Sequence, residues 1–386
     1  MRVLVVSTDY PPHRCGGYEL QCAGAVAHLR AHGHEVRVLT SARAGGAPDP
    51  LATGVHRDLV RFPVTGDAPD RHAGERVNAA ALRAHLESFA PDVVSWWRLG
   101  ELSMSMPARA AQAGVPGVGM VCDPWFLDGP RRDPMGTEPD RTAARWLFAS
   151  HALRDQVGGE GDVVAPGIEL ARFPLAPRAD WDWRLLYAGR LSPLKGVDVA
   201  IRALAQLPPD ATLDIVGDGD PTYVASLHAL ARELSLTARV RFAGAAAPDG
   251  MARAYAAADA VLFPVTWAEP FGLVPLEAMA VGRPVVATGT GGSASYLRDG
   301  ANALLAAPGD ASALAAAVAR LAARRELRDR LRAGGRATAE RHPAERSHAA
   351  VRQALESAAA PRIATRRSAW RSKVSSSRPA HAAAPR

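Results

Sequence analysis

The stretch RVLVVSTDYPPHRCGGYELQCAGAVAHLRAHGHEVRVLT, residues 2–40, decides the fold. It begins with a short apolar run and continues through a loop rich in proline and glycine. Apolar positions then recur at helical spacing over residues 19–34, and residues 35–40 form a second apolar run. A strand, a helix and a strand in this order make a βαβ unit. The stretch therefore predicts a parallel sheet with helices on both of its faces.

The same alternation continues along the chain in two series. In the first series we expect strands at residues 91–97, 114–123 and 161–167, with helices at 79–90 and 105–114. The second series follows a charged, proline-containing stretch. Its predicted strands are 184–190, 211–217, 239–244, 260–265 and 283–288, and its predicted helices are 196–207, 222–236, 249–258 and 272–282.

Length and pattern together predict a two-domain α/β protein. A chain of 386 residues exceeds the size at which one core usually stops growing. The two series join near residues 170–183, and both are doubly wound. Ligands of such sheets lie beyond the carboxyl ends of the strands, so we expect two domains that face each other across a cleft.

The basic excess of the chain lies at its end. Of the net charge of +7, all is accounted for by residues 361–386, which leaves 39 basic and 39 acidic residues in 1–360. The basic residues of the end are Arg362, Arg366, Arg367, Arg371, Lys373, Arg378 and Arg386. The neutral body argues against nucleic acid as a partner. The end, rich in Ser, Ala and Pro, predicts a disordered basic tail, either simply solvated or in weak peripheral contact with an anionic membrane surface.

Cysteine usage and hydropathy bear on the compartment. The three cysteines are too few for a disulfide framework, which fits a reducing environment. No apolar run approaches the length of a transmembrane helix, the first residues included. We expect a cytoplasmic protein.

Two glutamates eight residues apart, Glu269 and Glu277, flank a predicted helix start in EPFGLVPLE. Pro275 suits the first helical position, which places Glu277 near the third and leaves Glu269 in the preceding loop. A helix start attracts anions such as a diphosphate, which the two carboxylates would repel. We therefore expect Glu277 to bind ribose hydroxyls and Glu269 sugar hydroxyls on either side of it. The alternative is a capping-turn acid and a surface acid.

Two cations follow the first strand of the second series. That strand ends in Gly189 and Arg190, and Lys195 comes just before the next helix. A guanidinium and an ammonium at the carboxyl end of a strand supply the charge that a diphosphate needs. The alternative is a surface pair at a helix start, but the chain has few lysines, which weakens it.

Four other patterns leave alternatives open. Asp218 and Asp220 have the spacing of a magnesium or manganese site but also suit a turn. Three histidines at the end of the first helix could bind a metal ion. The sequence GTGGS at 289–293 lacks the full dinucleotide fingerprint and gives weak support to a nicotinamide oxidoreductase. Trp96 and Trp97 suit an acceptor platform or the core.

Taken together, these loops resemble the retaining glycosyltransferases of family 4, which have the GT-B fold of two Rossmann-like domains. The resemblance covers nearly all of residues 1–360. Its motifs are DYPPHRCGGYEL with AHGHEVRVLT, VVAPGIELARF, YAGRLSPLKGVD and, the most specific, EPFGLVPLEAMAVGRPVVAT with its E-x7-E spacing.

The resemblance implies domain limits. The first, acceptor-side domain comprises residues 1–172 and is completed by a closing helix at 343–360. The linker is 173–182, and the domains would open and close about residues 170–183. The second domain, at 183–342, binds the nucleotide sugar.

The resemblance also implies an activity: retaining transfer of a hexose-type sugar from a nucleotide-diphosphate sugar to a hydroxyl or amine. The acceptor would be a small molecule, a glycan or a lipid, in secondary-metabolite or cell-surface glycan biosynthesis. No cofactor other than the donor and no metal ion would be required. The alternative is a catalytically weak nucleotide-sugar-binding protein of the same fold.

The site residues implied by the resemblance fall into two groups. Glu269 would contact the donor sugar, while Arg190 and Lys195 would hold the diphosphate and stabilise its growing charge. The remaining donor-binding positions are Gly16, Gly17, Gly189, Phe271, Gly272, Leu273, Val274 and Glu277.

Two positions depart from the pattern of the family. Cys122 stands where many relatives have His, so the contact with the donor sugar or the acceptor is altered or moves to Asp123. Ser295 stands where relatives usually have Glu. Both departures bear on donor-sugar selectivity and leave the phosphate-binding residues unchanged.

Overall fold

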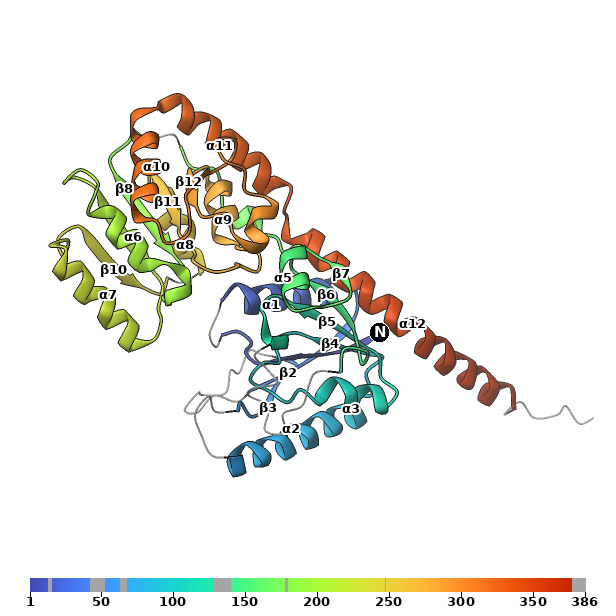
Figure 1. Ribbon diagram of the computed structural model, residues 1–386. Helices are drawn as coiled ribbons and strands as arrows, with labels where there is room; N and C mark the ends of the chain where they lie inside the picture. The colour runs from blue at the N-terminus through green and yellow to red at the C-terminus, as the bar shows by residue number, and fades with distance from the viewer. Residues whose placement is uncertain are drawn as a thin grey trace, which may run out of the picture. The chain divides into compact units, whose positions relative to one another are not determined.

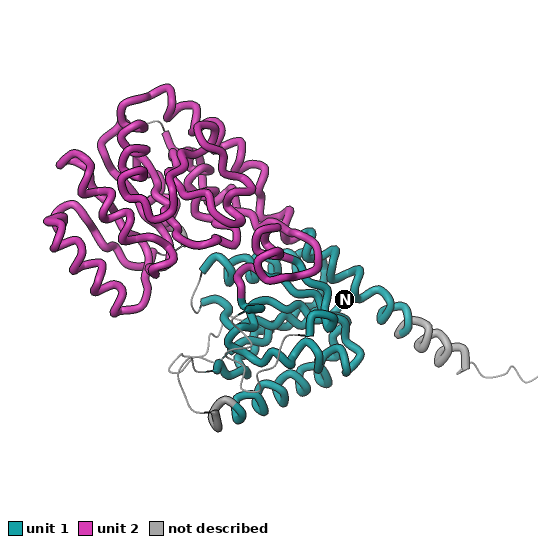
Figure 2. Tube along the Cα trace, viewed as in Figure 1, with its two compact units in different colours: residues 1–121, 125–147, 349–386 teal, residues 122–124, 148–348 magenta. Residues whose placement is uncertain are grey.

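The computed structural model describes residues 1–12, 16–41, 53–62, 68–127, 140–177, 180–246 and 248–376. The chain is an α/β protein with two sheets (Figure 1). It divides into two compact units (Figure 2). Unit 1 comprises residues 1–121, 125–147 and 349–386, and unit 2 comprises residues 122–124 and 148–348.

The first sheet has the strand order β3-β2-β1-β4-β5-β6-β7. Its strands are β1 (Arg2–Ser7), β2 (Glu35–Ser41), β3 (Val55–Leu59), β4 (Val93–Trp96), β5 (Gly117–Val121), β6 (Arg145–Phe148) and β7 (Asp162–Val163). The helices in this part of the chain are α1 (Gly17–Ala31), α2 (Ala68–Phe89), α3 (Met106–Gln112), α5 (His151–Gln156) and η1 (Leu170–Arg172).

The predicted βαβ unit is confirmed, and β1 is the strand on which it is built. Val3 pairs in parallel register with Val36 of β2 on one side and with Val93 of β4 on the other. Because both faces of a parallel sheet are covered, its inner strands need apolar side chains at successive positions. Residues 3–6 meet that requirement and are at most 1% exposed.

The second sheet has the strand order β10-β9-β8-β11-β12-β13. Its strands are β8 (Arg184–Ala188), β9 (Thr212–Val216), β10 (Val240–Gly244), β11 (Ala260–Phe263), β12 (Val285–Ala287) and β13 (Leu304–Leu305). Its helices are η2 (Pro193–Lys195), α6 (Val197–Leu204), α7 (Pro221–Glu233), α8 (Pro248–Ala257), α9 (Val274–Val281), η3 (Gly291–Ser295), α10 (Ala311–Ala323) and α11 (Arg325–Glu340).

The core of unit 2 joins this sheet to α6, α7, α10 and α11. Helix α6 buries six of its eight residues, and its buried side chains share one cluster with Leu213, Leu262, Val318 and Leu331. Two parallel-stranded α/β sheets agree with the predicted fold class.

The predicted disordered tail is wrong as far as residue 376. Helix α12 runs from Ala344 to Ser376 and continues through Pro361. The lost amide of Pro361 is tolerated in a segment rich in the helix formers Ala and Arg. In addition, the guanidinium of Arg362 donates to the carbonyl of Gly114 in unit 1. Residues 377–386, with Arg378 and Arg386, lie outside the described residues.

The compact units differ from the predicted domain limits. Residues 148–172 group with unit 2, as does the predicted linker 173–182. Hydrogen bonds explain this grouping, because the Ser150 hydroxyl donates to the Pro270 carbonyl at 2.7 Å and the Ile168 amide donates to the His342 carbonyl at 2.9 Å. Helix α12 begins in unit 2, and its residues from Ala349 onward group with unit 1.

Within the described residues, every helix is too short or too polar to cross a lipid bilayer.

Gly219 offers a test of the packing between two loops of unit 2. A Cβ at this position would lie 2.0 Å from the Leu191 carbonyl oxygen, which is backbone and has little freedom to move. We expect Gly219→Ala to destabilise the protein by about 1–3 kcal/mol, as overpacking does, and so to lower the thermal midpoint by several degrees. Gly250→Ala in α8, where the nearest atom is 3.6 Å away, is the control and should leave the midpoint unchanged or raise it. Equal midpoints for the two variants would refute the close contact.

Candidate functional site

The loop after β8 is held in place by the loop after β9. The Gly189 amide donates to the Val216 carbonyl at 3.0 Å, and the Leu191 amide donates to the Asp218 carbonyl at 2.7 Å. Gly189 and Gly196 have φ of +139° and +66°, which side chains other than glycine rarely adopt. Arg190 and Lys195 therefore belong to a loop of defined shape at the carboxyl end of β8.

The structure brings Lys195 and Glu269 together. The Lys195 Nζ lies 2.7 Å from the Glu269 Oε2, and the Trp267 Nε1 donates to the same oxygen at 2.8 Å. The Lys195 ammonium also lies 5.2 Å from the centroid of the Trp267 ring. Glu269 is 7% exposed, and in the protein without ligand its charge is balanced by Lys195.

Arg190 stands apart from this pair. Its side chain is exposed, and within the described residues its guanidinium has no ion-pair partner. The Arg190 carbonyl accepts a hydrogen bond from the buried Tyr187 hydroxyl at 3.0 Å. The backbone is thus anchored while the charged group is left available to an anion.

Glu277 lies on α9 with a different partner. The Tyr255 hydroxyl donates to its Oε2 at 2.7 Å. Burial raises the pKa of the Glu277 carboxyl, while the Tyr255 hydrogen bond and the charge of Arg172 oppose that rise. The two glutamates therefore differ in their surroundings: Glu269 is paired with the Lys195 cation, and Glu277 with the neutral Tyr255 hydroxyl.

The start of α9 differs by one residue from the prediction. The helix begins at Val274, so Pro275 occupies the second position and Glu277 the fourth. The reason is that the Glu277 amide donates to the Leu273 carbonyl at 3.0 Å and so closes the first turn from Leu273. The amides of the first turn ahead of Glu277 have no acceptor inside the helix.

Glycines shape the loop that precedes α9. Gly272 has φ of +84°, and its carbonyl accepts from the Tyr296 hydroxyl. A Cβ at Gly292 would lie 2.0 Å from the Pro270 carbonyl oxygen. The glycines of GTGGS thus allow two backbones to approach each other, a structural explanation that needs no dinucleotide. Phe271, the predicted donor-binding neighbour of Gly272, is buried with its ring 5.2 Å from that of Tyr296.

The remaining predicted site residues are divided between the two units. Cys122 and Asp123 directly follow β5 and group with unit 2, and both are partly buried. Gly16 and Gly17 belong to unit 1, where Gly16 caps α1. The Gly16 amide donates to the Glu19 Oε2 at 2.8 Å, so Glu19 fixes the glycine loop.

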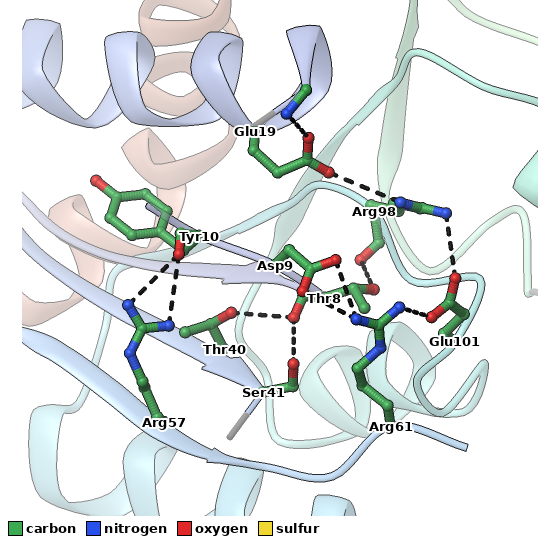
Figure 3. Close-up of polar contacts among 11 residues, drawn as sticks. Thr8, Asp9, Tyr10, Glu19, Thr40, Ser41, Arg57, Arg61, Arg98 and Glu101 are labelled. Carbon is green, nitrogen blue, oxygen red and sulfur yellow. Dashed lines mark hydrogen bonds and ion pairs between the residues drawn. The ribbon is translucent and has the colours of Figure 1, made fainter. Parts of the chain in front are cut away.

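Sequence reasoning missed a charged network in unit 1, drawn in Figure 3. Arg61 bridges two carboxylates: its Nη1 lies 3.1 Å from the Asp9 Oδ1 and its Nη2 donates to the Glu101 Oε2. Arg98 continues the network, with its Nη2 3.2 Å from the Glu101 Oε1 and its Nη1 3.7 Å from the Glu19 Oε1. Burial raises the pKa of the Glu19 carboxyl, and the hydrogen bond to the Gly16 amide and the charge of Arg98 oppose that rise.

The network lies where the sheet ends. Asp9 follows β1, Arg61 follows β3, and Arg98 follows β4, so all three come from the carboxyl edge of the sheet. Asp9 and Arg98 directly follow predicted strands, a signal that could have found these two residues, whereas the strand before Arg61 was not predicted. The edge of unit 1 offers paired charges and hydroxyls rather than an apolar surface, a composition that suits a polar ligand.

The open alternatives of the sequence are answered in part. The Asp220 Oδ1 accepts from the Thr222 and Tyr223 amides at 2.9 and 3.2 Å, as the cap of α7, so the turn interpretation holds. Trp96 and Trp97 are 0% and 2% exposed and belong to the core, so the acceptor platform is wrong.

The histidines at the end of α1 are not gathered into one cluster. His34 pairs with Glu356 at 3.2 Å, whereas the rings of His28 and His32 contact each other. Among the described residues, the potential ligand set is His56, Asp58 and His85. There the His85 Nε2 already pairs with the Asp58 Oδ2 at 2.8 Å and the Arg37 guanidinium lies 3.3 Å from its Nδ1, which satisfies the ring without a metal.

Removing Arg61 tests the network. Asp9 and Glu101 are 6% and 8% exposed, so Arg61→Ala would leave two buried carboxylates short of a counter-charge. We expect a loss of about 3 kcal/mol of stability, measured by denaturant unfolding. The control is Arg241→Ala, which breaks the exposed pair with Asp214 and should cost less than about 1 kcal/mol. Similar losses for both variants would show that the network is energetically a surface feature.

Comparisons with known proteins agree with this architecture. Among solved structures, Anabaena HepE in complex with UDP-glucose superposes with a TM-score of 0.76 at 23% identity, covering 92% of this chain and 100% of that one. The sucrose-phosphate synthase of Thermosynechococcus elongatus superposes with a TM-score of 0.76 at 21% identity, covering 91% and 97%. These likenesses show that the fold is the GT-B fold.

Sequence relatives give the family. Residues 176–338 match the model of the glycosyl transferases group 1. The chain is 30% identical to the glycogen synthase of Mycobacterium tuberculosis strain CDC 1551, over 82% of this chain and 85% of that protein. It is 35% identical to the D-inositol 3-phosphate glycosyltransferase of Acidothermus cellulolyticus, over 79% of this chain and 78% of that protein. The chain therefore belongs to the group 1 glycosyltransferases.

Proposed function

We propose that this glycosyltransferase is a retaining, metal-independent enzyme of family 4 that uses a nucleotide-diphosphate sugar as donor. The acceptor is a hydroxyl or amine of a small molecule, a glycan or a lipid. The observation that carries the proposal is the Lys195–Glu269 pair, with 2.7 Å between Nζ and Oε2. In the sequence, Glu269 comes shortly before the first turn of α9, whose amides have no acceptor inside the helix. A cation, an acid and a helix start together match the charge layout of a sugar diphosphate.

Donor binding would redistribute the partners of this pair. The diphosphate competes with Glu269 for the Lys195 ammonium, and the exposed Arg190 guanidinium adds a bidentate donor. Glu269 is then free to accept hydrogen bonds from hydroxyls of the sugar while Trp267 keeps it oriented at 2.8 Å. Glu277 accepts from the ribose. The positive groups supply the charge compensation for which other transferases use a metal ion.

The reaction follows from that arrangement. The bond between the anomeric carbon and the leaving phosphate oxygen breaks, and a bond to the acceptor oxygen or nitrogen forms on the same face of the sugar. The acceptor proton passes to the leaving phosphate. Lys195 and Arg190 stabilise the negative charge that grows on the diphosphate as the bond breaks, which lowers the barrier. No protein nucleophile takes part in this scheme.

The relatives support a nucleotide-sugar donor. The HepE structure contains UDP-glucose, and the sequence relatives are a glycogen synthase and a D-inositol 3-phosphate glycosyltransferase. We place the donor in unit 2, with Gly189, Phe271, Gly272, Leu273 and Val274 as its backbone contacts. For the loop of Gly16 and Gly17 in unit 1 we propose close approach to the donor.

One observation favours a catalytically weak binding protein instead. Ser295 stands at a position where the resemblance predicts Glu, and its hydroxyl donates to the Gly292 carbonyl at 2.6 Å. The Ser295 hydroxyl is thus used in a hydrogen bond within its own turn and is not directed to a donor. Tight binding of a nucleotide sugar without transfer or hydrolysis would favour this second function.

Lys195 and Glu269 provide the first test. A thermal-shift screen of UDP, GDP, ADP and dTDP identifies the base, and turnover of the matching sugar donors is then followed by mass spectrometry. We expect Lys195→Ala and Glu269→Gln to lower kcat by about 10²- to 10³-fold, because each removes a group that stabilises the transition state. The control Arg320→Gln, an exposed residue of α10, should leave kcat unchanged. Full turnover in both site variants would disprove the proposal.

Glu277 provides a test by pH. Only its ionised form accepts from both ribose hydroxyls, and burial raises its pKa. Nucleoside diphosphate affinity should therefore fall as the pH drops through that raised pKa. In Glu277→Gln it should be about tenfold weaker at neutral pH, with this contribution to the pH dependence removed.

A stability measurement separates this role from a structural one. A raised carboxyl pKa means that the folded protein holds the proton more tightly than the unfolded chain, so ionisation at neutral pH lowers stability. Glu277→Gln should accordingly keep or raise the Tm at pH 7. A lowered Tm together with unchanged nucleotide affinity would assign Glu277 a purely structural role.

A further inference from the structure

A cavity of ≈ 50 Å³ lies in unit 2 near the starts of β11 and β12. Its lining includes Asp259, which directly precedes β11, and Arg283 and Pro284, which directly precede β12. The candidate donor residues follow the carboxyl ends of strands of this sheet, whereas these residues come before the strands. The cavity is therefore distinct from the proposed donor site.

Two buried donors in the lining lack acceptors. Arg283 is 7% exposed, and its Nε has no hydrogen-bond partner. The Trp181 Nε1 is likewise buried and unpartnered. A buried N–H without an acceptor costs free energy that a ligand oxygen would recover. Two such groups in one cavity point to a ligand rich in acceptor oxygens.

The charges of the lining favour an anion. Four arginines line the cavity: Arg283, Arg325, Arg328 and Arg332. Burial lowers the pKa of the Arg283 guanidinium, the charge of Arg332 lowers it further and the charge of Asp259 opposes this, so a negative ligand would add to the stabilisation of the charged form. Arg328 is oriented by carbonyls of α10, with its Nη1 2.6 Å from that of Leu321, and its guanidinium lies 5.5 Å from the Trp181 ring.

Three carboxylates in the lining reduce this positive charge but do not cancel it. Asp259 is already committed, because its Oδ2 accepts from the Asp182 and Arg184 amides at 2.9 Å each and its Oδ1 lies 3.4 Å from the Arg184 guanidinium. Asp180 and Asp329 also line the cavity. The lining thus holds four guanidinium groups and three carboxylates, and Arg184 also compensates one of these carboxylates, so the excess of positive charge favours an anion over a cation.

Carbonyl groups near the cavity are occupied as well. Helix α9 ends there, and its last carbonyls would repel an anion. The Ala278 and Met279 carbonyls, however, accept from the Arg283 and Gly282 amides. The Arg332 Nη1 covers the Gly282 carbonyl at 3.3 Å.

We propose that this cavity binds a phosphate group, either inorganic phosphate or the phosphate of a small phosphomonoester. A tetrahedral oxyanion presents acceptor oxygens in several directions at once and so suits a lining that carries N–H donors on several residues, Arg283, Trp181 and Arg325 among them. Arg325 lies at the exposed start of α11 and would close over the anion. The site depends on no residue of the proposed donor site.

Calorimetry on the full chain in a phosphate-free buffer tests the proposal, with inorganic phosphate and glycerol 3-phosphate as the two probes. Arg325→Gln and Trp181→Phe should each weaken phosphate binding about tenfold, since each removes a hydrogen-bond donor to a charged group. The matched control Arg320→Gln, with the same loss of charge, should bind as the unmodified chain does. Tighter binding of glycerol 3-phosphate would identify a phosphomonoester as the ligand, and equal or weaker binding would identify phosphate itself.

A second variant separates this cavity from the proposed donor site. Lys195→Ala should retain phosphate binding at the cavity, and saturating UDP should not displace it. The proposal is overturned if the unmodified chain binds neither probe, if Lys195→Ala abolishes binding, or if Arg325→Gln and Trp181→Phe bind as tightly as the control. Unfolding curves of the variants confirm that lost affinity is not lost structure.

Discussion

Parallel strand pairing is the constraint on which the rest of the structure depends. In a parallel sheet all carboxyl ends lie at one edge, so every loop that leaves a strand there is brought beside its neighbours. This is why Asp9, Arg61 and Arg98, far apart in the sequence, form one ion-pair network. It is also why Lys195, after β8, meets Glu269, after β11. The buried apolar strands fix the positions of the loops from which these polar side chains project.

Charge balance then determines what each edge can do. In unit 1, Arg61 and Arg98 are each paired with two carboxylates, so both guanidinium groups of the network drawn in Figure 3 already have acidic partners. In unit 2, the pair of Lys195 and Glu269 is balanced while Arg190 is exposed. An anion that binds to unit 2 can therefore pair directly with Arg190. It can also pair with Lys195 by displacing Glu269 from the ammonium. This difference supports the donor in unit 2 and a polar ligand at unit 1.

Much of this could be predicted from the sequence, and the limits have physical causes. Buried parallel strands such as β1 are continuous apolar runs, so the fold class and most strands were predicted. Glu269 and Lys195 became candidates because glycine, proline and charge occur at short fixed spacings in each of their two loops. The network of Asp9, Arg61 and Glu101 was missed because its members come from three loops, and sequence alone gives no distance between loops. Helix α12 was cut short because composition outweighed the helix propensity of its alanines.

The loops around the candidate donor site rest on contacts between backbones. A Cβ at Gly217 would lie 1.8 Å from the Gly189 carbonyl oxygen, and one at Gly291 would lie 2.5 Å from that of Glu269. Such loops cannot gain specificity by exchanging these glycines, since any larger residue would push the main chain out of position. Under the proposed function, a new donor preference would instead come from side chains attached to this unchanged backbone, and Cys122 and Ser295 are the positions that the resemblance suggests. A mutant library aimed at donor preference should therefore keep these glycines unchanged and vary the residues whose side chains do not make the backbone contacts.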